Sequence, residues 1–138
     1  MNSKGLWYFA HPYTAKDADG HYVYAAEEAN FRLCAMRAGE LLKRGYNIYA
    51  PIVHSHPIHS ACPDFLRTHE HEIWYGLDNQ VIARTSWDGI ILAPGWEFSG
   101  GCKMERRQFE ERDLVVRLYD EIMQKRSTYW DAYGGPPK

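Results

Sequence analysis

The segment Leu6-Trp7-Tyr8-Phe9-Ala10 is a short apolar run that ends at His11-Pro12. It predicts a strand that is buried on both faces of a sheet. The polar stretch 14–22 is predicted to form a loop. The segment 27–44 then predicts a helix, because its apolar residues recur at helical spacing. They are Phe31, Cys34, Ala35, Ala38, Leu41 and Leu42.

A second short strand is expected at 47–50, so residues 6 to 50 form a strand, a helix and a strand. This unit is typical of a parallel sheet. The alternation continues with a mostly helical stretch at 64–83, which Gly76 is expected to interrupt. Strands are predicted at 89–92 and 114–118, and helices at 102–112 and 120–130. We therefore predict one α/β domain over residues 1–138, a three-layer sandwich around a doubly wound parallel sheet, with 134–138 as a flexible tail.

Composition excludes several classes of protein. With 45% apolar and 25% charged residues among 138, the chain is neither disordered nor collagen-like nor a coiled coil. Its 16 basic and 18 acidic residues form no polybasic field, so a nucleic-acid polymer is not an expected partner. Apolar runs such as 89–95 are far shorter than the roughly 20 residues that span a bilayer, so a membrane is not expected either.

The three cysteines, Cys34, Cys62 and Cys102, are an odd number at wide spacings. A disulfide framework is therefore not expected, and a reducing cytoplasm is the predicted location. The apolar part of the N-terminus is too brief for a secretory signal.

Ligands of doubly wound sheets bind beyond the carboxyl ends of the strands. The first such place holds Ala10-His11-Pro12-Tyr13-Thr14, a turn rich in hydrogen-bonding side chains. It matches neither a Walker loop nor a GxGxxG motif, so dinucleotide and triphosphate sites are disfavoured and no cofactor is predicted.

The second place holds His54, His56 and His59 in the pattern HxHxxH. In an extended segment alternate residues share a face, which suggests a metal site. No carboxylate lies within that loop, so we favour a polar lining of a pocket floor and predict no metal. A solvent-exposed loop is the remaining alternative.

The third place combines Ser99 and two glycines just before a helix, with Glu105 following. A hydroxyl and free backbone N–H groups at a helix N-terminus suit an anion or a hydroxyl group. The helix dipole is expected to keep Glu105 ionised, as a nucleophile or an oxocarbenium stabiliser requires. An ordinary capping box is the alternative interpretation.

These motifs together resemble the nucleoside 2-deoxyribosyltransferase superfamily, which includes deoxynucleoside 5′-monophosphate N-glycosidases and CMP-type nucleotide hydrolases. The chain looks closest to its short bacterial and phage members. The resemblance covers residues 6 to 118 and rests on a set of segments in the same order. They are Tyr8-Phe9-Ala10-His11-Pro12-Tyr13, Asp78, Asp88, Leu92-Ala93-Pro94-Gly95-Trp96 and Ser99-x-Gly101-x-x-x-Glu105.

The resemblance implies a flavodoxin-like or Rossmann-like sheet and cleavage of the N-glycosidic bond of a nucleoside or a nucleotide. It implies that Glu105 is the nucleophile and that Asp78 assists it or handles the proton of the departing base. Tyr13 matches a tyrosine near the nucleophile, Asp88 an acidic position before a strand, and Ser99 the residue that binds the sugar 5′ group or its phosphate.

The chemistry of the reaction agrees with the roles of Glu105 and Asp78, because glycoside cleavage with retention uses two carboxyl groups about 5 Å apart. Asp78 would serve as the general acid if burial raised its pKa. Glu105, Asp78 and Tyr13 are thus the candidate catalytic residues. The candidate substrate-binding residues are Tyr8, His11, Asp88, Trp96, Ser99, Gly101, His54 and His56, with Phe98 a further stacking candidate.

The sugar could be transferred either to water or to a second base, and the sequence does not decide between these acceptors. A metal-dependent hydrolase built on His54, His56 and His59, or a non-catalytic nucleotide-binding module, are the alternative functions. A homo-oligomer is expected, with the segment 120–133 as the candidate contact through Ile122, Met123, Tyr129 and Trp130. Packing of this segment on its own sheet is the competing possibility.

Overall fold

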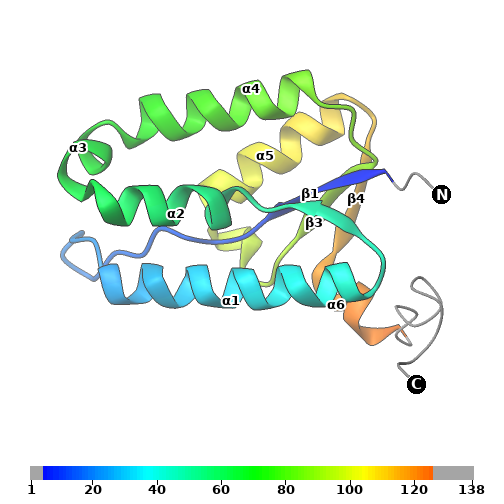
Figure 1. The fold of residues 1–138 in the computed structure, drawn as a ribbon, viewed down its shortest axis with the longest axis horizontal. Coiled ribbons are helices and arrows are strands. Elements are labelled where there is room, and N and C mark those ends of the chain that lie inside the picture. Colours follow the sequence, from blue (N-terminus) through cyan, green and yellow to red (C-terminus); the bar gives the residue numbers. More distant parts are fainter. Residues whose placement is uncertain (1–4, 126–138) are drawn as a thin grey trace.

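The fold is a three-layer α/β sandwich, and the computed structural model describes its residues 5–125 (Figure 1). Four strands form one sheet in the order β2-β1-β3-β4, and every neighbouring pair is parallel. They are β1 (Leu6–Ala10), β2 (Asn47–Tyr49), β3 (Gly89–Leu92) and β4 (Val115–Leu118). The predicted fold class is therefore confirmed, whereas the predicted tail 134–138 lies outside the described residues.

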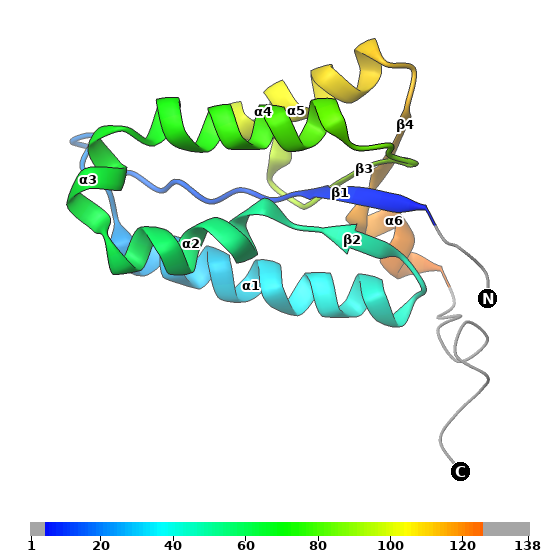
Figure 2. The ribbon, with the colours of Figure 1, turned by 45° about the horizontal axis from the view of Figure 1, so that its top comes forward.

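Helices cover both faces of the sheet, as Figures 1 and 2 show. On one face, α1 (Tyr24–Lys43) and α6 (Tyr119–Gln124) pack on Trp7, Phe9 and Ile91. On the other, α4 (Gly76–Arg84) and α5 (Gly100–Glu111) pack on Tyr8, Ala10 and Ile90. Because successive side chains of a strand point to opposite faces, the fully apolar β1 serves both cores.

Helix α1 begins three residues earlier than predicted, at Tyr24. Cys34, Ala38 and Leu41 of the predicted stripe are buried in the core. Gly45 follows the helix with φ +87°, a left-handed conformation that glycine adopts without strain.

The connection from β2 to β3 is more helical than the sequence indicated. Residues expected to form a loop with three histidines instead form α2 (Pro51–Ala61), which begins with a proline at its first position. Next come α3 (Pro63–Thr68), the π-helical turn η1 (His71–Tyr75) and α4. Gly76 keeps helical angles, so the expected break there is wrong.

Two of the four residues expected at an oligomer contact pack against the core of their own subunit. Ile122 of α6 is buried in the core, and Met123 packs against the same cluster. These two residues therefore stabilise their own sheet. Tyr129 and Trp130 lie outside the described residues.

Among residues 5–125, every helix is either too short or too polar to cross a bilayer. Cys34, Cys62 and Cys102 are all free thiols, and Cys62 is the exposed one. A short 3₁₀ turn, η2 (Trp96–Phe98), joins β3 to α5.

We predict that Gly89→Ala destabilises the protein by about 1–3 kcal/mol, because overpacking a rigid core costs this much. A Cβ at Gly89 would lie 2.2 Å from the backbone oxygen of Val115 and 2.6 Å from the Trp7 ring. Gly39 in α1 is the matched control, since a Cβ there meets nothing within 4 Å. Gly39→Ala should stabilise the helix by about 0.5–1 kcal/mol. Urea unfolding would measure the free energy of unfolding of both variants. Equal changes in the two variants would contradict the close approach of β3 to β4.

Candidate active site

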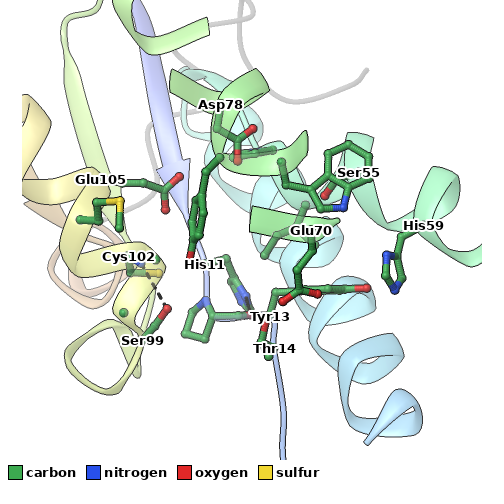
Figure 3. A pocket seen from close by; sticks show the side chains of 18 of the residues that line it. His11, Tyr13, Thr14, Ser55, His59, Glu70, Asp78, Ser99, Cys102 and Glu105 are labelled. Carbon is green, nitrogen blue, oxygen red and sulfur yellow. Dashed lines mark hydrogen bonds between the residues drawn. The ribbon is translucent and has the colours of Figure 1, made fainter. Parts of the chain in front are cut away.

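A cavity of about 610 Å³ lies beyond the carboxyl ends of the strands (Figure 3). Its size suits a small-molecule site. Residues that follow β1, β2 and β3 all contribute to its wall, as the parallel topology led us to expect. The chain leaves β1 toward β2 on one side and returns to β3 on the other, so the cavity lies at the topological switch point of the sheet.

Glu105 reaches this cavity from α5. The hydroxyl of Tyr8, a fully buried residue of β1, donates a hydrogen bond to its Oε2. Burial raises the pKa of Glu105 to about 8, the charge of Asp78 adds to the rise, and the Tyr8 hydrogen bond opposes it. The expectation that the helix dipole keeps Glu105 ionised is therefore wrong for the ligand-free protein. Glu105 lies beyond the first turn of α5, where the dipole is weak, and desolvation dominates.

Asp78 lines the same cavity from α4, and burial raises its pKa to about 6. Its charge acts on Glu105. Burial raises the pKa values of Tyr49 and Tyr75, and the charges of both carboxyl groups add to the rise. Two carboxyl groups from different helices thus interact at one end of the cavity (Figure 3). With pKa values raised to about 8 and about 6, the pair carries one proton between these two pH values.

The N-terminus of α5 forms the wall next to Glu105. The Ser99 hydroxyl caps the helix by accepting a hydrogen bond from the Cys102 N–H at 3.2 Å. Ser99, Gly100 and Gly101 all line the cavity. A Cβ at Gly100 would meet nothing within 4 Å, so open space adjoins the first helical amides. This is an environment that suits a hydroxyl group or an anion.

Tyr13 lines the cavity, but its hydroxyl lies 2.7 Å from His56 Nδ1 and does not bond to Glu105. The tyrosine in contact with Glu105 is Tyr8, which we had expected to stack on the substrate. His56 is buried behind Tyr13 and bonds through Nε2 to Glu28. In the neutral histidine, Tyr13 donates to Nδ1, which leaves its oxygen able to accept from a ligand.

His11 lines the cavity with both ring nitrogens occupied. Its Nδ1 lies 2.8 Å from the Pro12 carbonyl oxygen, and Arg37 donates to its Nε2 at 2.9 Å. Burial lowers its pKa, so the ring is neutral. His11 therefore fixes the turn after β1 and offers the ligand chiefly its ring surface.

Besides Tyr8 and His56, three further expected binding residues are not part of the cavity wall. Asp88 is exposed before β3, at the opposite edge of the sheet, where its backbone N–H donates to the Leu6 carbonyl at 2.8 Å. His54 is exposed on α2. Trp96 packs against the second core and lies under the Arg106 guanidinium, 4.7 Å from the ring centroid. We accordingly revise these three assignments.

The far wall contains residues that the sequence analysis did not select. Glu70, Trp74 and Asp78 are spaced by four and all line the cavity, as does Tyr75. That spacing could have identified Glu70 and Trp74 within the stretch predicted as helical, had Gly76 not been expected to interrupt it. Arg67 in α3 pairs with Glu70 at 2.8 Å and with Glu27, which is 1% exposed.

The three histidines of α2 do not form a metal site. On a helix, residues two apart point in nearly opposite directions. His56 accordingly contacts Glu28 on one side, while His54 is exposed. The structure thus removes the geometric basis of the metal-hydrolase alternative.

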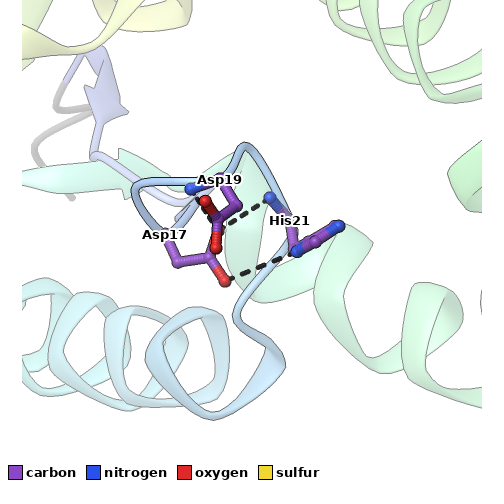
Figure 4. A group of neighbouring side chains, drawn as sticks. All are labelled: Asp17, Asp19 and His21. Atoms are coloured by element: carbon purple, nitrogen blue, oxygen red, sulfur yellow. Dashed lines mark hydrogen bonds and ion pairs between the residues drawn. The ribbon is translucent and has the colours of Figure 1, made fainter.

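A separate group comprises Asp17, Asp19 and His21 in the loop before α1 (Figure 4). All three residues are exposed. Asp17 Oδ1 accepts hydrogen bonds from the backbone N–H groups of Asp19 and His21, each at 2.9 Å. The carboxylate of Asp17 therefore closes a turn of this loop.

Residues 5–121 match the model of a protein family described as a domain of unknown function, DUF1937. Because this match spans most of the 138 residues, the chain belongs to that family. No curated protein matches the chain.

We predict that Tyr8→Phe raises the pKa of Glu105 further above 8, because the lost hydrogen bond favours the ionised carboxylate. Carbon-13 NMR titration of labelled glutamate carboxyl carbons would measure the change. Tyr49→Phe is the control, since its hydroxyl lies near the same pair but makes no bond to Glu105. An unchanged or lower pKa in Tyr8→Phe would show that the contact contributes little in solution.

Proposed function

We propose that this protein cleaves the N-glycosidic bond of a nucleoside or a nucleoside 5′-monophosphate, with Glu105 as the nucleophile and Asp78 as the general acid. One observation carries the proposal: two coupled carboxyl groups from different helices face one cavity, with pKa values raised to about 8 and about 6. Pairs of carboxyl groups whose environments separate their pKa values are the usual machinery of glycoside cleavage.

In the first step an ionised Glu105 oxygen attacks the anomeric carbon of the sugar. The bond from that carbon to the base nitrogen breaks, its electron pair stays on the nitrogen, and Asp78 supplies the proton that neutralises the departing base. The product is a glycosyl ester on Glu105. Water, or a second base, then attacks the same carbon, Glu105 leaves as a carboxylate, and Asp78 accepts the proton of the incoming nucleophile.

The protonation state constrains this reaction. The ligand-free pair holds one proton between its two pKa values, chiefly on Glu105. The reactive arrangement, with Glu105 ionised and Asp78 protonated, is the minor form of the same singly protonated state. Tyr8 supports this form, because its hydrogen bond favours the Glu105 carboxylate. Positive charge that develops on the sugar favours it further in the transition state.

The remaining wall supports the proposed substrate class. The amide groups and the hydroxyl at the start of α5 suit a sugar 5′ hydroxyl or a phosphate, the role that resemblance to the nucleoside 2-deoxyribosyltransferase superfamily implies for Ser99. Tyr13, Trp74 and Tyr75 provide aromatic surface for a base. The proposed enzyme needs no cofactor in the steps above.

We also propose a cytoplasmic homo-oligomer. Free thiols at Cys34, Cys62 and Cys102 are compatible with a reducing compartment. Phe98 borders the cavity and is 91% exposed, which favours a second subunit near the cavity mouth.

Glu105→Gln should lower base release by at least about a thousandfold, because the amide cannot act as the nucleophile. Chromatography would detect free base after incubation with a panel of ribo- and deoxyribonucleosides and their 5′-monophosphates. Glu111→Gln is the control, since Glu111 is an exposed glutamate of the same helix. Full activity of Glu105→Gln would remove the nucleophile assignment. Nucleotide binding without turnover by the wild type would favour a binding module instead.

We predict a bell-shaped pH dependence of kcat/KM with limbs near pH 6 and pH 8, the values to which the carboxyl pair is raised. Below the lower limb both groups are protonated and no nucleophile is present. Above the upper limb both are ionised and no proton is available for the base. Initial rates between pH 5 and pH 9 would measure the profile, and a flat profile across this range would contradict the coupled pair.

A further inference from the structure

His59 is a buried side chain of the cavity wall that lacks a partner. Its residue is 4% exposed, it lines the cavity from α2, and its Nε2 has no hydrogen-bond partner among the described residues. A buried nitrogen without a partner costs free energy, and native proteins satisfy the great majority of such atoms. Because His59 also lines the cavity, a bound ligand is the candidate partner of this nitrogen.

Glu70 lies in the same part of the cavity, away from Glu105 (Figure 3). Arg67 donates to Glu70 Oε2 at 2.8 Å, while the other oxygen has only a long contact of 3.4 Å with the Tyr22 hydroxyl. Oε1 can therefore accept from a ligand. Both side chains line the cavity, and the charge of Glu70 acts on His59.

His59 and Glu70 line one lobe of the cavity, and the charges around this lobe disfavour the binding of a phosphate. Arg67 is shared between Glu70 and the buried Glu27, so the paired buried groups sum to one negative charge. Burial, followed by the nearby Arg67, lowers the pKa of His59, which is therefore neutral. Lys16 lines the cavity from an exposed position over the Tyr22 ring, 4.8 Å from its centroid. The anion-binding features lie at the other wall, at the start of α5.

Aromatic side chains connect the lobe with the carboxyl pair. Tyr75 lines the cavity, and its pKa is raised by burial and then by the charges of Glu70, Glu105 and Asp78. Trp74 and Tyr22 also line the cavity. A flat heteroaromatic ring with polar atoms on its rim matches this combination of aromatic faces and hydrogen-bonding groups.

We infer, on the basis of the proposed function, that His59 and Glu70 form the nucleobase subsite and select bases with an exocyclic amino group. Glu70 Oε1 accepts from the amino group, and His59 Nε2–H donates to the adjacent ring nitrogen. Adenine and cytosine present this edge. Hypoxanthine and uracil place a carbonyl oxygen opposite the carboxylate, and two acceptors facing each other repel.

The test is binding to the Glu105→Gln protein, which separates recognition from turnover and carries a neutral group where the native pKa is about 8. Isothermal titration calorimetry would compare two matched pairs, dAMP with dIMP and dCMP with dUMP. We expect each amino ligand to bind at least about tenfold more tightly than its oxo counterpart. Adding Glu70→Gln should abolish the preference, because an amide can either donate or accept.

In the Glu105→Gln protein, His59→Leu should weaken the binding of dAMP and of dCMP by about tenfold. His54→Leu, on the exposed side of the same helix, should leave both affinities unchanged. Thermal unfolding of each variant verifies folding, and His59→Gln, which keeps a donor, should recover part of the affinity. Equal binding within the pairs, a preference for the oxo ligand, or no binding of any of the four would overturn the inference. The predicted preference without base release by the wild type would refute the proposed catalysis and leave the subsite standing.

Discussion

The contact between Tyr8 and Glu105 is the constraint on which the rest of the candidate site depends. It joins the central strand β1 to helix α5 at the point where the sheet gives way to the cavity. Because Tyr8 is fully buried, the carboxyl group is brought into an environment that disfavours its charge. Asp78 adds a second acid to the same environment, so both carboxyl groups have pKa values above those of carboxyl groups in water.

Much of the fold follows from the sequence. The apolar β1 and β3 and the stripe of α1 are patterns that fix a parallel sheet between helical layers. The segment after β2 was misjudged because Pro51, Pro57 and three histidines are typical of a loop, whereas a proline at the first turn also starts a helix. Local propensity did not distinguish these outcomes, and packing of α2 on α1 decided between them.

The candidate site was predictable where it depends on strand order. Glu105, Asp78, Ser99 and Tyr13 all line the cavity. Asp88 was misassigned because residues before a parallel strand lie at the other edge of the sheet. The charge of Glu105, the partner of Tyr13 and the unpartnered nitrogen of His59 depend on tertiary burial, which spacing in the sequence does not encode.

The ion pairs of Arg67 have a consequence for how a ligand arrives. Arg67 ties the segment after α3 to Glu27 in α1, and its guanidinium lies 3.8 Å from the centroid of the Tyr22 ring. Disrupting this cluster would strand a charge in a buried setting, so the wall is held rigid before any encounter. The entropic cost of ordering these side chains is therefore met when the chain folds, and a ligand of the proposed class would bind to a surface that is already ordered.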